Sequence, residues 1–317
     1  MIFGMAVPKA GCVAARLSGV FLIAGFISAP ACAQDYGDTP YVPTPQNVVD
    51  KMLEVAKVGP KDYVIDLGSG DGRMIITAAK KYGARGFGVD LDKQLVKRAN
   101  GLAAKSGVAD RAKFYARDLY DTDVSPATVV TIYLLPEVNL MVRPKLLATL
   151  KPGTRIVSHD YDMGEWPPDL ALTLDAPDKP VGRDRKSKVF YWVVPAKASG
   201  KWRWQLALEG RTRDYELALN QSFQNIQGVL SADGVKVAIE EARLSGTQVS
   251  FSATINQNGA AVRHTFSGRI AGDAIKGQAQ IMRGAAAEQL AWKAARAESW
   301  APAHASLKPP PAPQLPN

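Results

Sequence analysis

The sequence predicts an α/β domain with a parallel sheet, followed by an antiparallel all-β domain that forms a barrel or a sandwich. Apolar strands alternate with helices between about residues 62 and 194, a pattern typical of a parallel sheet with helices on both faces. One of these strands runs into the glycine-rich turn Asp66-Leu-Gly-Ser-Gly-Asp-Gly72. After Pro195 the apolar residues instead recur with a period of two, which indicates antiparallel strands.

The first domain is predicted to cover residues 34–197, after a proline-containing segment at 34–45. Residues 47–57 have apolar side chains at helical spacing and should pack on the sheet. Strands are predicted near residues 62–66, 85–90, 112–116, 128–134, 154–159 and 188–194, and further helices near 73–82, 93–106 and 137–150. The last strand is one continuous apolar run, which indicates a position inside the sheet.

The second domain is predicted to cover residues 198–298. Apolar and polar residues alternate at 202–208 and 249–255, and turn-like sequences lie at 232–234, 245–246, 256–259 and 271–273. Strands about ten residues apart with tight turns are typical of an antiparallel meander. Residues 299–317 are rich in proline and are expected to be disordered.

The first 33 residues have the layout of a secretory signal peptide. Lys9 and Arg16 precede an apolar core at 17–28, and Ala31-Cys-Ala33 offers small residues for cleavage. The apolar core is shorter than the ~20 residues that a membrane-spanning helix needs. An uncleaved anchor is the alternative. We therefore expect an exported protein that is periplasmic or associated with the membrane.

Composition limits the kinds of site that the chain can hold. The two cysteines, Cys12 and Cys32, both lie in the predicted signal, so we expect no disulfide, no thiolate metal site and no cysteine nucleophile. Only three histidines are available, and no metal site is predicted. Without Lys9 and Arg16 the net charge falls from +9 to +7, a balance that mildly favours acidic partners or an anionic membrane surface, but no basic run is dense enough to predict a nucleic-acid partner.

The glycine-rich turn indicates that a nucleotide-like ligand approaches the backbone closely. Gly68, Gly70 and Gly72 alternate behind Asp66, whereas a dinucleotide fingerprint would require another glycine at the position of Arg73. The next strand ends in Asp90, a carboxylate placed to accept hydrogen bonds from two ribose hydroxyls. The alternative for Asp90 is the N-cap of the following helix.

These motifs resemble those of the seven-strand, Rossmann-like class I methyltransferases that use S-adenosylmethionine. The resemblance implies that the glycine turn faces the methionine part of the cofactor, that the strand ending in Asp90 meets the ribose, and that Asp118 meets the adenine. The implied cofactor-binding residues are Asp66, Gly68, Ser69, Gly70, Asp71, Asp90, Leu91, Asp118 and Leu119. For Asp118 the alternative is a solvated acid in a turn.

A closer resemblance covers about residues 38–195. Tyr41-Val-Pro-Thr-Pro45, the turn at 66–73 and Val157-Ser-His-Asp160 with Trp166-Pro-Pro168 resemble the mitochondrial-type protein lysine methyltransferases. Members of that family modify the ATP synthase c subunit and the adenine nucleotide translocase. The resemblance implies a protein substrate that is methylated on a lysine side chain.

The same resemblance implies that Tyr41 and Thr44 border the methyl-transfer site, with segment 41–45 acting as a lid. The alternative is that the segment is only fixed to the sheet. Tyr133 lies where many amine methylases carry an Asn/Asp-Pro-Pro-aromatic loop, and it completes the predicted catalytic set although the Asn or Asp is missing. His159 is either a base or a packed histidine at a strand end.

Two other functions compete with lysine methylation. One is an exported binding protein that keeps the methyltransferase fold for another adenosine-like ligand. The other gives the role to the β domain, which would bind an envelope ligand or partner while the first domain serves as a scaffold. The complete set of acids and glycines favours the enzyme, since a scaffold has no physical need for all of them.

Overall fold

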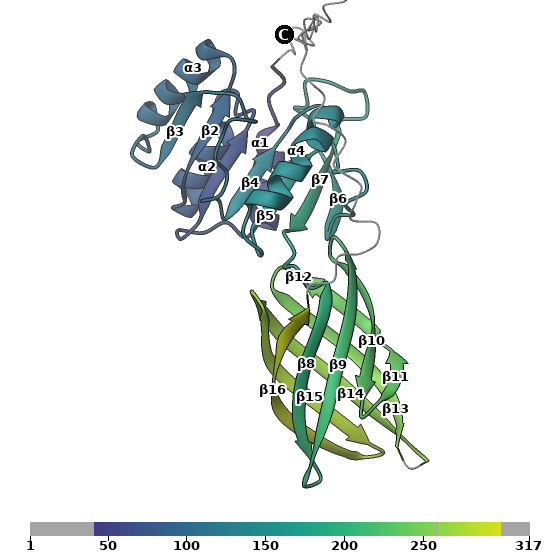
Figure 1. Ribbon diagram of the computed structural model, residues 1–317. Helices are drawn as coiled ribbons and strands as arrows, with labels where there is room; N and C mark the ends of the chain where they lie inside the picture. The colour runs from purple at the N-terminus through teal and green to yellow at the C-terminus, as the bar shows by residue number, and fades with distance from the viewer. Residues whose placement is uncertain (1–40, 258, 299–317) are drawn as a thin grey trace, which may run out of the picture. The chain divides into compact units, whose positions relative to one another are not determined.

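The computed structural model describes residues 41–257 and 259–298. The predicted signal peptide (1–33), residues 34–40 and the predicted disordered tail (299–317) lie outside the described residues. The described chain forms one seven-stranded and one nine-stranded sheet (Figure 1). Within the described residues, no helix is both long and apolar enough to cross a membrane.

The first sheet carries four helices, as predicted. Its elements are, in chain order, α1 (Gln46–Val55), β1 (Tyr63–Leu67), α2 (Arg73–Tyr82), β2 (Arg85–Asp90), α3 (Lys93–Lys105), β3 (Ala112–Ala116), β4 (Val129–Ile132), α4 (Pro136–Thr149), β5 (Arg155–His159), β6 (Leu170–Asp175) and β7 (Lys186–Val193). The strand order is β3-β2-β1-β4-β5-β7-β6. The order reverses between β1 and β4, and ligands of open α/β sheets bind at such a switch point, outside the carboxyl ends of the strands.

Two features of this sheet differ from the prediction. The strands from β3 to β5 are parallel, but β7 runs antiparallel to β5 and pairs with β6 as a hairpin. The resemblance to the seven-strand class correctly implied a sheet of seven strands, but the residues of β6 were not among the six strands predicted from the sequence pattern. Strand β6 lies at the edge of the sheet, and its side chains are exposed or only half-buried, so it lacks the buried apolar run of a central strand.

Each face of the sheet has its own hydrophobic core, because successive side chains of a strand point to opposite faces. Val64 of β1 belongs to the cluster that contains buried residues of α1, α2 and α3. Ile65 and Leu67 belong to the opposite cluster, which contains Val142 and Leu146 of α4. The helices thus cover both faces, which leaves the strand ends available for a ligand.

The second sheet is antiparallel throughout. Its strands are β8 (Gly200–Leu208), β9 (Arg211–Ser222), β10 (Asn225–Ala232), β11 (Val235–Ala238), β12 (Glu240–Ser245), β13 (Gln248–Gln257), β14 (Ala260–Ala271), β15 (Ala274–Arg283) and β16 (Ala286–Glu298). Their order is β11-β10-β9-β8-β16-β15-β14-β13-β12. Strand β10 also contacts β12, and β11 contacts β13, so the sheet curls into a nearly closed barrel (Figure 1). Of the two predicted forms, the barrel is the nearer.

Aromatic side chains fill the interior of this barrel. Trp204 stacks on Tyr215 with ring centroids 5.3 Å apart, and it meets Phe266 and Trp292 at 5.1 and 5.0 Å. All four rings are buried. This cluster accounts for the period-two pattern, because the alternate residues of each strand point inward.

Candidate functional site

The glycine turn between β1 and α2 has the backbone conformation that its sequence requires. Gly68, Gly70 and Gly72 have φ values of 80°, 51° and 80°, a region that side chains other than glycine rarely adopt. A Cβ on Gly70 would lie 2.3 Å from Cε2 of Tyr41, so the ring of Tyr41 covers this glycine directly. Of the three glycines, Gly68 is exposed, whereas Gly70 lies beneath the ring of Tyr41 and Gly72 is buried.

Asp66 is buried beneath the turn. The hydroxyl of Thr131 donates to its Oδ1 at 2.7 Å. The pKa of Asp66 is raised to about 7, chiefly by burial and to a smaller extent by the neighbouring carboxylates Asp90 and Asp71, while the hydrogen bond from Thr131 opposes the shift. Asp66 therefore changes its charge near neutral pH.

Asp90 lies at the end of β2 and is tied to the glycine turn. The backbone N–H of Gly70 donates to its Oδ2 at 2.8 Å, and that of Asp92 donates to its Oδ1 at 3.0 Å. The helix N-cap is Asp92, whose side chain accepts from the N–H groups of Gln94 and Leu95, so the alternative role for Asp90 is excluded. Each oxygen of Asp90 keeps a lone pair that can accept a ribose hydroxyl.

The remaining predicted cofactor residues take different positions. Leu91 is 73% exposed beside Asp90. Asp118 accepts from the N–H of Tyr120 at 2.8 Å, and Leu119 packs against the core on the α4 face. The hydroxyl of Ser69 is buried without a partner among the described residues, and its side chain fills the space where Gly88 would carry a Cβ. The roles of these residues stay predictions.

Segment 41–45 is fastened to the glycine turn by Arg73, a residue that was not among the predicted site residues. Its guanidinium pairs with both oxygens of Asp71 at 2.9 and 2.7 Å. It also donates to the carbonyl oxygen of Thr44 at 2.7 Å and to the hydroxyl of Tyr41 at 3.5 Å. The guanidinium of Arg73 holds the pKa of Asp71 below its usual range although burial opposes this. Asp71 is thus occupied by Arg73 in the structure.

His159 lies fully buried at the end of β5. Its Nδ1 is 3.1 Å from the hydroxyl of Thr44, and its Nε2 is 2.9 Å from the hydroxyl of Ser187. Burial lowers the pKa of His159 to about 4, so the ring is neutral at pH 7. Both ring nitrogens are engaged, which makes His159 a packed histidine that positions Thr44.

Tyr133 and Asp160 meet where β4 and β5 end. The hydroxyl of Tyr133 donates to Oδ2 of Asp160 at 3.5 Å, and its ring lies 3.9 Å from the ring of His159. Burial, with the charge of Asp160, raises the pKa of Tyr133, so its phenol stays protonated. The same carboxylate oxygen is paired with Lys179 at 2.8 Å. Lys179 was not predicted as a site residue, because the sequence around it, Pro177 to Pro180, is typical of an ordinary loop.

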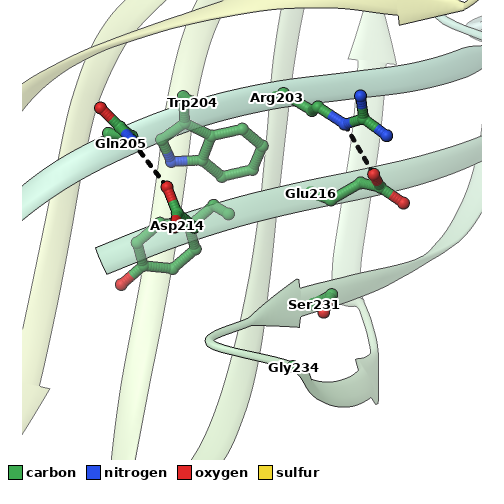
Figure 2. Close-up of a pocket in the computed structure, with 8 residues that line it drawn as sticks. Arg203, Trp204, Gln205, Asp214, Glu216, Ser231 and Gly234 are labelled. Carbon is green, nitrogen blue, oxygen red and sulfur yellow. Dashed lines mark hydrogen bonds and ion pairs between the residues drawn. The ribbon is translucent and has the colours of Figure 1, made fainter. Parts of the chain in front are cut away.

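The second domain contains a separate cavity of about 560 Å³. Its lining residues are Arg203, Trp204, Gln205, Asp214, Tyr215, Glu216, Ser231 and Gly234. Figure 2 shows Arg203 paired with Glu216 and Gln205 donating to Asp214, both at 2.7 Å. These four polar side chains pair with one another, whereas Nε1 of Trp204 and the hydroxyl of Tyr215 are buried without a hydrogen-bond partner among the described residues. No predicted site residue lines this cavity.

The first domain's residues fit S-adenosylmethionine. Gly68, in a left-handed conformation, is exposed and leaves backbone for the methionine part, Asp90 keeps free lone pairs for the ribose, and Asp66 is an acid near the predicted position of the cofactor's ammonium. Among the described residues no group of three or more His, Cys, Asp or Glu could hold a metal ion.

Comparisons with known proteins agree with this fit. A model of the ANTKMT methyltransferase domain matches residues 66–170. A protein-lysine N-methyltransferase from Saccharolobus islandicus (strain REY15A) is 48% identical over 137 residues, which cover 43% of this chain and 85% of that protein. The human lysine N-methyltransferase of the ATP synthase c subunit is 30% identical over 159 residues, covering 50% of this chain and 66% of that protein.

Among solved structures, an RNA methyltransferase from Salinibacter ruber in complex with S-adenosyl-L-homocysteine is 49% identical. The match covers 49% of this chain and 95% of that one, with a TM-score of 0.45. The Saccharolobus protein decides the family, because nearly half of the aligned residues are identical and most of its length is covered. The chain therefore belongs to the family of S-adenosylmethionine-dependent protein-lysine N-methyltransferases.

Proposed function

We propose that this chain transfers the methyl group of S-adenosylmethionine to the ε-amino group of a lysine in a protein substrate. The observation that carries the proposal is the cluster of Tyr133 and Asp160 beside the cofactor edge of the sheet. A carboxylate with an aromatic neighbour suits an alkylammonium group. The names of the Saccharolobus and human relatives support the same acceptor.

Methyl transfer forms a bond between the lysine nitrogen and the methyl carbon while the carbon–sulfur bond breaks. S-adenosylmethionine supplies the activated methyl group, and S-adenosylhomocysteine leaves. The acceptor must first lose a proton to solvent, which costs about 4.6 kcal/mol at pH 7 for an amine with a pKa near 10.4. The protein therefore has to align the amine and exclude water from it. Tyr41, Tyr133 and the segment fastened by Arg73 are the residues that we assign to this task.

The test combines cofactor binding with identification of the methylated atom. Calorimetric titration with S-adenosylhomocysteine should give micromolar binding. Incubation with deuteromethyl-labelled S-adenosylmethionine and a peptide array should then give mass gains on lysine-containing peptides, read by tandem mass spectrometry. Arginine and histidine peptides and total RNA serve as competing acceptors. Label found on RNA or on another side chain, but never on lysine, would contradict the proposal.

We further propose that residues 1–33 direct the chain out of the cytoplasm, and that methylation occurs at the membrane or before export. The layout of Lys9, Arg16 and Ala31-Cys-Ala33 supports this proposal. Cell fractionation with sequencing of the mature N-terminus tests it. A chain that begins at Gln34 in the envelope fraction agrees with export, whereas an uncleaved cytosolic chain does not.

A further inference from the structure

Lys179 is a buried lysine in the loop between β6 and β7. It is only 9% exposed, and lysine is rarely buried to this extent unless it is paired. Its Nζ lies 2.8 Å from Oδ2 of Asp160 and donates to the carbonyl oxygen of Lys186 at 2.6 Å. A primary ammonium group of this chain therefore lies at the carboxylate of the candidate acceptor site.

Asp160 is held rigidly for such a contact. Its φ of 61° is unusual for a residue other than glycine. The N–H of Lys188 donates to its Oδ1 at 2.9 Å, which leaves Oδ2 to face Lys179 and the hydroxyl of Tyr133. Nε2 of His159 is 3.5 Å from the same oxygen, but this ring is neutral. Lys179 thus supplies the positive charge that the structure pairs with Asp160.

The loop that carries Lys179 has little else to keep it in place. Of the described residues 177–186, Lys179 is the one that is buried, and the others are exposed. Hydrogen bonds within the loop, such as those from Arg185 to the carbonyl oxygens of Pro177 and Lys179, can move with it. Withdrawal of Lys179 therefore exposes almost no additional apolar surface, and the cost is mainly that of the ion pair with Asp160 and the hydrogen bond to the carbonyl oxygen of Lys186.

We propose that Asp160 is the carboxylate that receives the ammonium group of the acceptor lysine, and that Lys179 occupies this position until a substrate lysine displaces it. The inference rests on the proposed function, since it names the contact made by that function's acceptor. Asp160 is on this view a positioning residue, and Lys179 an internal competitor. Lys179 already places an alkylammonium group at Oδ2 of Asp160, the oxygen that also accepts from Tyr133, so this position suits such a group.

The first experiment measures binding without methyl transfer, on the full chain saturated with S-adenosylhomocysteine. The probe is n-butylammonium chloride, followed by saturation-transfer NMR. Lys179→Ala should bind the probe about tenfold more tightly than the wild type, because the position is vacated, whereas the double variant Lys179→Ala, Asp160→Asn should not bind it. Lys186→Ala removes a charge from the adjoining first residue of β7 without vacating Asp160 and should behave as the wild type. Absence of binding to folded Lys179→Ala would overturn the proposal.

A wild-type measurement keeps the test valid if Lys179→Ala does not fold. N-acetyl-Nε,Nε-dimethyllysine methylamide keeps an ammonium proton but cannot be acylated. Its addition should raise the rate at which an N-hydroxysuccinimide ester acetylates Lys179, read by peptide mass spectrometry. The norleucine analogue should have no effect. An unchanged acetylation rate at saturating dimethyllysine probe would overturn the proposal.

The second experiment separates competition from a merely structural ion pair. With N-acetyl-lysine methylamide as acceptor, Lys179→Ala should lower KM about tenfold at nearly constant kcat, since the binding-competent fraction rises. Asp160→Asn in that background should restore a high KM. An unchanged KM in Lys179→Ala would assign Lys179 a structural role. If no variant methylates lysine although S-adenosylhomocysteine binds, the proposed function fails, and the binding of n-butylammonium still decides this inference.

Discussion

At the level of single residues, Asp66 combines a buried carboxylate with two acidic neighbours, Asp71 and Asp90. Because burial raises its pKa to about 7, the folded protein favours the protonated form. The stability that this form contributes is present below the unfolded pKa of 3.8 and is lost as pH rises through about 7. A cation bound near Asp66 has the opposite effect to burial, because it favours the ionised carboxylate over the protonated form.

We therefore expect the affinity for S-adenosylmethionine to increase as pH rises through about 7. The cofactor's ammonium and sulfonium charges favour ionised Asp66, and binding should release a proton. Calorimetry in two buffers of different ionisation enthalpy measures that proton. Asp66→Asn keeps the shape of the side chain and should remove both effects. Equal pH dependence of the two proteins would contradict this role of Asp66.

Asp90 and Asp92 provide a matched pair of acids on one turn. Asp90→Ala should weaken S-adenosylhomocysteine binding about 100-fold, because two hydrogen bonds to a charged group are lost at about 1.5 kcal/mol each. Asp92→Ala removes the cap of α3 and should cost about 1 kcal/mol of stability with little change in affinity. Calorimetry and urea unfolding measure the two quantities. An Asp90→Ala protein that binds as the wild type would disprove the ribose assignment.

At the level of elements, the contact between segment 41–45 and α2 depends on one side chain. Arg73 bridges Asp71, the carbonyl oxygen of Thr44 and the hydroxyl of Tyr41, a fork that lysine cannot reproduce. Arg73→Lys should therefore increase hydrogen exchange at residues 41–45 and reduce methyl transfer, with a smaller effect on cofactor binding. Exchange mass spectrometry and single-turnover rates test this. Unchanged exchange at 41–45 would show that Arg73 does not fasten the segment.

The helices and strands of the structure also show which of its features the sequence could predict. The turn at 66–72 was predictable because left-handed glycines and a following helix form within a few neighbouring residues. The antiparallel hairpin of β6 and β7 was not predictable, because the alternation of strands and helices that precedes it does not mark the change from parallel to antiparallel pairing. The pairing of Asp160 with Lys179 depends on the return of the chain through that hairpin, and no local pattern marks it.

At the level of the whole molecule, the two sheets have separate hydrophobic cores. The barrel interior is built from residues between Ala196 and Ala294, and the two clusters around the first sheet are built from residues between Val48 and Val194. We expect calorimetry to resolve two unfolding transitions. S-adenosylhomocysteine should raise the midpoint of only one of them, because a ligand stabilises the unit that binds it. A single transition shifted as a whole would indicate that both domains unfold cooperatively.

The pairing of β8 with β16 has a consequence for how the barrel is synthesised. These are the first and last strands of the second sheet, yet they lie side by side in its middle. Strands β8 to β11 and β12 to β16 each pair with chain neighbours soon after they are made, but the two groups cannot join until β16 leaves the ribosome. Until then β8 presents an unpaired edge, which is a hazard for aggregation. Protection of this edge of β8 is therefore needed until the final strand of the barrel arrives.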